Sequence, residues 1–407
     1  MTTQTKTTWR RVKLGEIVTE RGSVSGPFGS NIHSRFYAKT GVPIIRGNNL
    51  TIGISGGRYI DDDYIYLSKE KAEELSQSEA LPDDIVITAR GTIGQTGIVP
   101  HKSKYSRYIL SANQLRFRIN KNVADPIFVY YWLSSKPMVR TMQNISVNVG
   151  VPNFNLKNAR ELLIPLPSPE DQKCIAEILS AFDDKIELNN KISRTLEEMV
   201  QAIFKEWFVK SEKLKVKSEK LSNLVKTQYG YTESASEKEI GPKFLRVKDI
   251  NKTDWVDWNT VPYCKISDSD FPKYRLRKGD VVIARMADPG KVAIVEEDID
   301  AVFASYLIRL QIVSDEITPY FLFYYLRSRL YQDFIFGAST GTTRQSANAR
   351  VITDVELAVP PKEKILEFEN LTSTIRGKMS ATVKENQKLA ALRDLLLPKL
   401  MSGALRV

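Results

Sequence analysis

The chain has 407 residues, of which 42% are hydrophobic and 26% charged, a composition that is typical of globular proteins and leaves room for two domains. Its formal net charge of +11 points to a polyanionic partner. Two cysteines, Cys174 and Cys264, and two distant histidines, His33 and His101, exclude a disulfide framework or zinc site and leave little material for histidine chemistry.

The first half contains a β-rich region followed by helical patterns. Residues 85–89, IVITA, form a β-branched run between Asp and Gly, which predicts a buried strand. Residues 126–135, PIFVYYWLSS, open with proline and contain no turn residues, so we expect a helix. Its aromatic residues, Tyr130, Tyr131 and Trp132, are expected to lie in a core rather than to stack on bases. The cluster PLPSPE at 165–170 then ends one domain and starts a long helix.

The second half repeats this order at an offset of 193 residues. Residues 319–328, PYFLFYYLRS, align with 126–135 without gaps, and the same offset places Asn155 on Asn348 and Arg116 on Arg309. The run VVIA at 281–284 matches the earlier strand, and VPPKE at 359–363 starts a second long helix. The chain is therefore predicted to be a duplicated α+β architecture with pseudo-two-fold symmetry.

Positive charge is distributed unevenly over this duplication. Lys and Arg exceed Asp and Glu by 8 between residues 10 and 165 but only by 1 between 211 and 360. The segment 166–210 carries −3, and 361–407 carries +4. The first half is therefore expected to be the stronger electrostatic anchor for a polyanion.

Both long helical stretches carry apolar residues at three- and four-residue steps, which is coiled-coil spacing. Neither stripe fits inside a small domain, so we expect the two helices to pack on each other in an antiparallel coiled coil. Polar Asn189 and Thr382 near the middle either set the register or are merely tolerated there. The predicted seam comprises Ile178, Phe182, Ile186, Leu196, Ile203, Leu371, Ile375, Met379, Leu389 and Leu396.

The motifs on this framework resemble those of type I restriction–modification specificity subunits. The resemblance is carried by SGPFGSNI (25–32), by the related turns ITARGTIGQTG and VIARMADPGKV, and most specifically by the central block at 164–208. It implies two target-recognition domains, at 1–167 and 211–360, each reading half of a bipartite DNA site. The helical segments 168–210 and 361–407 would set the spacing and dock methyltransferase subunits, two of them, with helicase-nuclease restriction subunits joining through the complex.

The sequence favours a non-catalytic role. There is no phosphate-binding G-x-x-x-x-G-K-[ST] loop, no G-x-G-x-x-G, and no Asn/Asp-Pro-Pro-aromatic tetrapeptide of base methyltransferases. We therefore predict no catalytic residue, no cofactor and no metal. Without an apolar run of roughly 20 residues or a signal peptide, we expect a cytoplasmic protein that binds no membrane. A stand-alone DNA- or RNA-binding protein and an enzyme with an unrecognised site are the alternatives.

Polar loops supply the candidate DNA contacts, because Arg reads guanine, Asn and Gln read adenine, and Lys and backbone amides bind phosphates. The alternative for each is a solvated turn or a role in the fold. In the first half they are Gly29, Ser30, Asn31, Arg46, Asn48, Asn49, Arg90, Thr92, Asn113 and Gln114. In the second half they are Arg246, Lys248, Arg285, Lys291, Thr340, Thr342, Thr343, Arg344 and Gln345.

Overall fold

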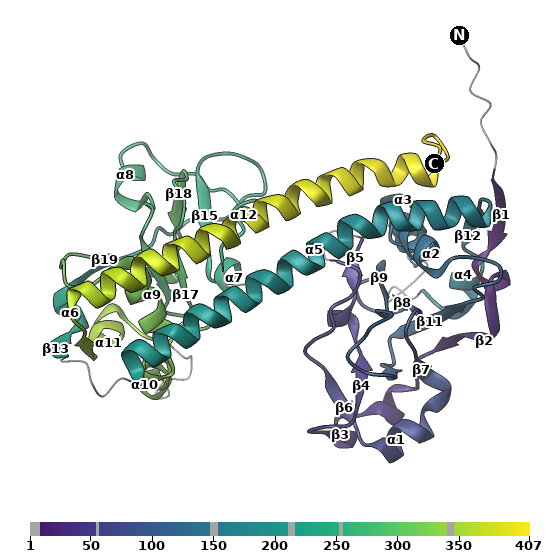
Figure 1. The fold of residues 1–407 in the computed structure, drawn as a ribbon, viewed down its shortest axis with the longest axis horizontal. Coiled ribbons are helices and arrows are strands. Elements are labelled where there is room, and N and C mark those ends of the chain that lie inside the picture. Colours follow the sequence, from purple (N-terminus) through teal and green to yellow (C-terminus); the bar gives the residue numbers. More distant parts are fainter. Residues whose placement is uncertain (1–8, 54–56, 147–153, 211–215, 252–254, 340–345) are drawn as a thin grey trace, which may run out of the picture. The chain divides into compact units, whose positions relative to one another are not determined.

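A computed structural model describes residues 9–53, 57–146, 154–210, 216–251, 255–339 and 346–407 (Figure 1). Its contacts divide the chain into two units, Met1–Lys191 with Thr382–Val407, and Ile192–Ala381. Each unit contains one mixed α/β region and a part of both long helices, so we describe the units one at a time.

The α/β region of the first unit is built on two five-stranded sheets. One has the order β2-β11-β8-β9-β5 and the other the order β3-β6-β4-β10-β7, while β1 pairs with β12. The strands are β1 Arg10–Lys13, β2 Val18–Ser25, β3 Tyr37–Ala38, β4 Val42–Ile45, β5 Thr51–Ile52, β6 Ile65–Leu67, β7 Glu79–Ala80, β8 Ile85–Thr88, β9 Gln95–Ile98, β10 Tyr108–Leu110, β11 Gln114–Ile119 and β12 Leu163–Leu166.

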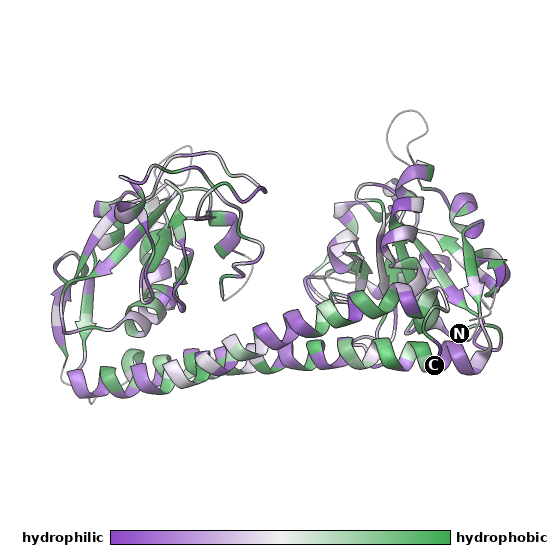
Figure 2. Cartoon of the chain, turned by 90° about the horizontal axis from the view of Figure 1, so that it is seen from above, coloured by the Kyte–Doolittle hydropathy of each residue, from purple (hydrophilic) through white to green (hydrophobic). Residues whose placement is uncertain are grey.

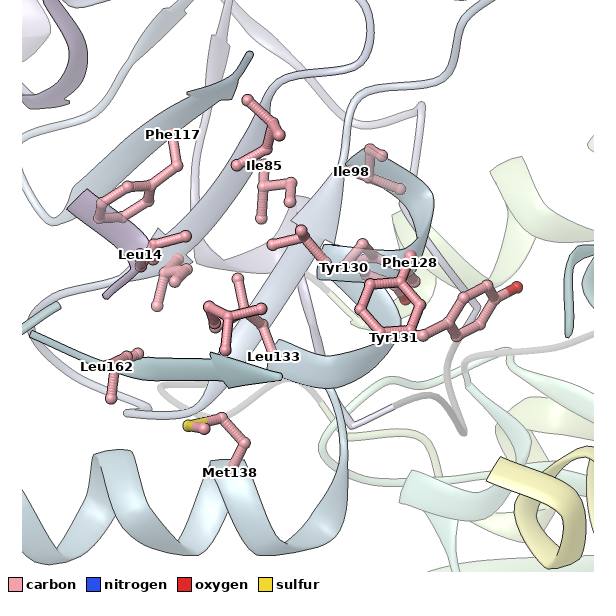
Figure 3. Packing of buried hydrophobic residues seen from close by; sticks show 14 of the residues in the cluster. Leu14, Ile85, Ile98, Phe117, Phe128, Tyr130, Tyr131, Leu133, Met138 and Leu162 are labelled. Carbon is pink, nitrogen blue, oxygen red and sulfur yellow. The ribbon is translucent and has the colours of Figure 1, made fainter. Parts of the chain in front are cut away.

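Four helices accompany these sheets, α1 Lys69–Glu74, α2 Pro126–Leu133, α3 Lys136–Ser146 and α4 Leu156–Arg160. The predicted helix at 126 is confirmed as α2, with proline in its first turn and the Asp125 carboxylate accepting from the amides of Ile127 and Phe128. The predicted strand at 85 is confirmed as β8, and all four of its residues are buried. Figure 3 shows Tyr130 and Leu133 of α2 in the same core cluster as Ile85 and Phe117.

The α/β region of the second unit repeats the central part of this arrangement. Its main sheet has the order β14-β19-β16-β17, which matches β2-β11-β8-β9, and β15 pairs in parallel with β18. The strands are β13 Lys217–Lys220, β14 Val225–Tyr229, β15 Lys243–Leu245, β16 Val281–Ala284, β17 Val292–Ile294, β18 Ala301–Phe303, β19 Leu307–Ile312 and β20 Glu356–Val359. The helices are α6 Leu221–Leu224, α7 Val247–Ile250, α8 Phe271–Tyr274, α9 Pro319–Arg327, α10 Arg329–Ser339 and α11 Ala349–Thr353.

Equivalent residues of the two repeats have the same structural roles. Asn155 caps α4 by accepting from the Asn158 amide at 2.9 Å, and Asn348 caps α11 by accepting from the Val351 amide at 3.0 Å. The strand predicted at 281–284 is β16, and the aromatic helix predicted at 319 is α9. The duplication deduced from the sequence is therefore present in the fold.

The long helices are α5, Pro169–Phe204, and α12, Lys362–Met401 (Figure 1). Within the first unit, Asp183 contacts Arg393 and Asn189 contacts Asn386, so the residue number falls along α12 as it rises along α5. Within the second unit, Glu197 contacts Arg376 and Phe204 contacts Phe368, so the residue numbers again run in opposite directions. The helices therefore pack antiparallel in each unit, which confirms the predicted α+β fold class with paired helices.

The buried line of these helices differs from the predicted apolar stripe. Figure 2 shows hydrophilic and hydrophobic residues alternating along both helices. Among the predicted seam residues, Met379 is buried and Leu371 is exposed, while the rest are half-buried: Ile178, Phe182, Ile186, Leu196, Ile203, Ile375, Leu389 and Leu396. Many of the buried mid-helix positions hold polar residues instead: Asp183, Asn189, Ser193 and Glu197 on α5, and Thr372, Arg376, Thr382 and Arg393 on α12.

This difference has a physical cause. Apolar periodicity finds positions that are buried because they are hydrophobic, whereas paired charges are buried because each satisfies the other. Asn189 is buried and uncharged, but its amide is satisfied in the same way, since it donates to Glu385 and Asn386, each at 2.8 Å. A register role for Asn189 is thus supported by specific partners on α12.

Candidate nucleic-acid interface

Several candidate residues of the first unit gather at one end of its β2-β11-β8-β9-β5 sheet. In the register of that sheet Ser25 of β2 faces Leu115, and Thr88 of β8 faces Gln114, so the ends of β2 and β8 meet the start of β11. The segments that leave these ends contain candidate residues of three loops. They are Gly29, Ser30 and Asn31 after β2, Arg90 and Thr92 after β8, and Asn113 before β11.

A further loop joins this sheet end through Gln95. The Gln95 amide donates to the carbonyl of Gly47 at 2.9 Å, and its oxygen accepts from the Thr88 hydroxyl at 3.0 Å. The loop that contains Asn48 therefore lies beside the end of β8. All seven exposed candidates of this unit belong to these four loops: Gly29, Ser30, Asn31, Asn48, Arg90, Thr92 and Asn113.

The remaining three candidates of this unit are engaged in the fold. Asn49 is fully buried and donates to the carbonyls of Ile60 and Asp62. Gln114 is also buried, and its amide oxygen is bound by the Ser111 hydroxyl. Half-buried Arg46 donates to the carbonyl of Asp63 at 2.9 Å. The amide of Asn49 is therefore occupied inside the domain, and Gln114 is buried with its oxygen hydrogen-bonded.

The second unit forms the same kind of sheet end. Tyr229 of β14 faces Ile308, and Ala284 of β16 faces Leu307 at the start of β19. Arg285 leaves β16 at this end, and its guanidinium donates to the carbonyl of Ser305 at 2.8 Å. Because Arg285 also lies 5.2 Å from the centre of the Tyr229 ring, it is half-buried, whereas its counterpart Arg90 is exposed.

The other candidates of the second unit differ in their environment. Lys248 and Lys291 are exposed. Arg246 forms a two-pronged ion pair with Asp249, with both nitrogen–oxygen distances at 2.9 Å. The remaining candidates lie outside the described residues: Thr340, Thr342, Thr343, Arg344 and Gln345.

A glycine turn supports each of the two sheet ends. Gly94 and Gly290 have φ values of +96° and +93°, a region that favours glycine. A Cβ on Gly94 would lie 2.7 Å from Val139 of α3, and one on Gly290 would lie 2.8 Å from Ile335 of α10. Both turns therefore need glycine for close contact with the helix behind them as well as for their backbone conformation.

Buried ion pairs make the strands behind these loops rigid. In the first unit Asp84 accepts from Arg118 at 2.9 and 2.8 Å, and this bond raises the pKa of Arg118, while burial lowers the pKa of neighbouring Arg116. In the second unit Arg309, the counterpart of Arg116, donates to Asp280 at 3.1 Å. The repeated arginine is thus part of the scaffold of each sheet.

Aromatic side chains on α2 belong to the core, as predicted, and those at the equivalent positions of α9 do so too. Tyr130 and Tyr131 are fully buried, Trp132 is half-buried, and Phe323, Tyr324 and Tyr325 are buried. The sequence reasoning did not list exposed aromatic residues at the sheet ends, among them Phe28, Tyr229 and Tyr306. Phe28, next to Gly29, is 83% exposed, and Tyr306, before β19, is 48% exposed. For Phe28 the signal was present, because a lone aromatic residue between Pro and Gly in a polar loop has no partner in the local pattern.

Across the described ranges no three His, Cys, Asp or Glu side chains are grouped so that they could hold a metal ion. The search for membrane spans over the same residues finds no helix with the length and apolar character required. The sheet ends carry hydrogen-bonding and positively charged groups on rigid strands, and this arrangement is suited to binding a polyanion.

Comparisons with known proteins agree with the duplicated architecture. The family model of the type I restriction modification DNA specificity domain matches twice, at residues 6–198 and 215–388. The type I restriction enzyme MjaIX specificity subunit of Methanocaldococcus jannaschii is 26% identical over 378 residues, 85% of this chain and 84% of that protein. The type I restriction enzyme HindI specificity subunit of Haemophilus influenzae is 22% identical, and the match covers 81% of this chain and 90% of that protein.

A solved structure shares the fold. The S subunit of a type I restriction–modification system from M. genitalium matches with a TM-score of 0.57 at 13% identity, over 98% of both chains. The family model covers most of this chain and does so once in each repeat. The chain belongs to the family of type I restriction modification DNA specificity domains.

Proposed function

We propose that this chain is the DNA sequence-specificity subunit of a type I restriction–modification complex and that each of its two sheet ends reads one half of a bipartite, asymmetric site. The supporting observation is that one sheet end, with polar loops around it, occurs twice in one chain on different loop sequences. Two similar scaffolds with unlike loops suit two unlike half-sites. The recognition regions in this proposal are residues 1–167 and 211–360.

The exposed loop residues divide by their chemistry into two roles. Arg90, Asn31, Asn48 and Asn113 carry groups that pair with base edges in the major groove. Lys248 and Lys291, the hydroxyls of Ser30 and Thr92 and the backbone of Gly29 suit phosphates. The candidates outside the described residues keep their proposed roles in the second half-site: Thr340, Thr342, Thr343, Arg344 and Gln345.

The helical segments 168–210 and 361–407 are proposed to dock two methyltransferase subunits, and restriction subunits join through the complex in the cytoplasm. Support comes from large apolar side chains that α5 and α12 leave exposed. Leu188, Met199, Leu392 and Leu395 are each about half exposed, at 53%, 49%, 50% and 56%. Apolar surface of this kind on a helix suits packing against further helices. Methyl transfer and nucleotide use belong to those partners.

The test of the proposal is a domain replacement read by methylome sequencing. Residues 211–360 are exchanged for the matching region of a relative with a different target, and methylated adenines are mapped in cells that also express the partner subunits. One half of the methylated site should change while the other stays as before. The exchange of residues 1–167 is the matched control and should change the opposite half. A change in both halves from either exchange would contradict independent reading.

The helices are further proposed to set the distance between the half-sites. The division between the two units falls after Lys191 on α5 and after Ala381 on α12. Four residues inserted at both points leave the Asn189 contacts with Glu385 and Asn386 within one unit. They add about 6 Å of helix, close to the rise of roughly two base pairs. The methylated sites should keep both halves and gain about two unread pairs, and an unchanged spacer in an active complex would refute this role.

A further inference from the structure

Each unit buries a charged pair between α5 and α12, next to a tyrosine of its α/β region. In the first unit the carboxylate of Asp183 on α5 binds the guanidinium of Arg393 on α12, and the two side chains are 2% and 1% exposed. The Tyr131 hydroxyl donates to the other oxygen of Asp183 at 2.5 Å. Burial and the neighbouring carboxylate together raise the pKa of Tyr131, which therefore stays a neutral donor.

The second unit contains the same triad with different surroundings. The carboxylate of Glu197 on α5 accepts from Arg376 on α12 at 2.7 Å, and the side chains are 3% and 2% exposed. The Tyr324 hydroxyl donates to Glu197 at 2.8 Å. Arg376 also pairs with Glu296 at 2.6 and 2.8 Å, and Arg327 donates to Glu197 at 2.7 Å. Both triads are thus fully buried and fully paired.

The internal repeat shows that the two triads do not place their charges at equivalent positions. At the offset of 193 residues Tyr131 aligns with Tyr324, but Asp183 aligns with Arg376. This one equivalent position therefore carries opposite charges in the two copies, whereas Glu197 aligns with Ala390 and Arg393 with Val200. As a result α5 supplies both buried acids and α12 supplies both buried arginines, although the two helices derive from the same repeated unit.

This distribution discriminates between possible helix pairs. If two α5 helices paired in the same antiparallel way, the region of Glu197 on one would face Asp183 on the other, and two carboxylates would be buried without a cation. Two α12 helices would place Arg376 near Arg393. Buried like charges are strongly destabilising, whereas the acid and arginine of an α5–α12 pair satisfy each other. A polar residue at a buried helix position is a known means of specifying the partner.

We propose that these two buried pairs are a pairing code, through which α5 accepts only a helix that presents arginines at both positions. The partner that fits is the second half of this chain, in the same molecule or in another copy. Two first halves, or two second halves, are rejected. The duplicated architecture therefore assembles as one asymmetric reader and excludes symmetric assemblies of a single half. This inference does not depend on the proposed DNA function.

The test starts from the folded full-length chain. A protease site is introduced within residues 211–215, the purified protein is cleaved, and two preparations with first halves of different mass are mixed, unfolded in urea and refolded together. Native mass spectrometry then counts the species. Only pairs of a first with a second half should form, with a preference of at least about 100-fold over pairs of like halves. Abundant pairs of two first halves in the wild type would overturn the proposal.

Neutral variants identify the residues responsible. In Asp183→Asn with Glu197→Gln the buried carboxylates are gone, so pairs of two first halves should appear. In this variant Arg393 still forms its ion pair with Asp394, and Arg376 still forms its ion pair with Glu296. The normal pair of a first with a second half should therefore also persist. The control, Glu177→Gln with Glu198→Gln, removes the same charge from exposed positions of α5 and should leave pairing strictly between unlike halves. If the buried variant behaves like the control, other residues determine the choice of partner.

A measurement on the uncleaved chain tests the code independently of refolding. Asp183→Arg alone places two arginines together, and Arg393→Asp alone places two carboxylates together, so each should lower the thermal midpoint. The double variant exchanges the charges and should recover most of the loss. A double variant no more stable than the worse single variant would show that complementarity between these two positions is not what the helices recognise.

Discussion

Replacement of Arg393 by methionine removes the cation from the buried triad of the first unit. Asp183 is 2% exposed, and among the described contacts its carboxylate is bound by Arg393 and by the Tyr131 hydroxyl. In the variant the carboxylate keeps only the neutral donor and cannot reach water. Loss of one partner from a buried ion pair costs about 3–5 kcal/mol, and we expect a loss of that size for Arg393→Met.

The opposite substitution should be milder because the two partners are not equally dependent on each other. In Asp183→Asn, Arg393 still pairs with Asp394 at 2.8 Å, and the Asp394 side chain is 31% exposed. The asparagine oxygen also still accepts from Tyr131. The expected loss is therefore about 1–2 kcal/mol, that of a weakened buried hydrogen bond. Asp183→Leu with Arg393→Met replaces the pair by apolar groups and should lie close to the wild type.

Hydrogen exchange of the α2 backbone, residues 126–133, is the appropriate assay, because it reports the opening free energy of the first unit alone. Exchange at α9 in the second unit provides the internal control and should not change. Two outcomes would refute the reasoning. One is a loss below about 1 kcal/mol for Arg393→Met, and the other is an equal loss for the two single variants.

Three further predictions concern the sheet ends and the cysteines. Arg90→Ala should weaken DNA binding by the assembled complex by about 1–3 kcal/mol without loss of stability. Arg285→Ala should instead lower the free energy of unfolding by about 1 kcal/mol, because it removes the bond to the Ser305 carbonyl. Binding titrations and unfolding titrations measure the two effects separately, and equal behaviour of the two variants would contradict the assignment. Gly94→Ala should destabilise the protein by about 1–3 kcal/mol more than Gly91→Ala, as measured by chemical denaturation. Both glycines have positive φ, but only Gly94 has a neighbour within 4 Å of the added Cβ. Burial raises the pKa of Cys264 to about 11, so its thiol stays protonated at pH 8. An alkylating reagent should therefore modify half-buried Cys174 first, and faster modification of Cys264 would contradict its burial.

Local chemistry allowed much of the framework to be predicted from the sequence. A proline in the first turn indicates where α2 and α9 begin, and β-branched runs between Asp and Gly indicate β8 and β16. These signals act within a few residues, so they survive without any knowledge of tertiary contacts. The repeat at 193 residues added the duplication, because a copied sequence adopts a copied fold.

Only the tertiary structure decided which polar residues face outward. Asn48 and Asn49 are neighbours of the same type, yet one is exposed and the other is buried against carbonyls of a segment 11 and 13 residues away. Arg90 and Arg285 align in the repeats, but Tyr229 and Ser305 hold only Arg285. A hydrogen-bonding side chain suits a loop surface and a satisfied interior equally well, so its sequence context does not distinguish the two.

The seam of the long helices shows the same division. The sequence determined that two helices of this length must pack on each other, because their apolar stripes need cover. It did not determine that Asp183, Glu197, Arg376 and Arg393 are buried between the helices. A charge is buried only when a distant residue of opposite charge arrives at the same place, and here that partner lies 179 to 210 residues along the chain.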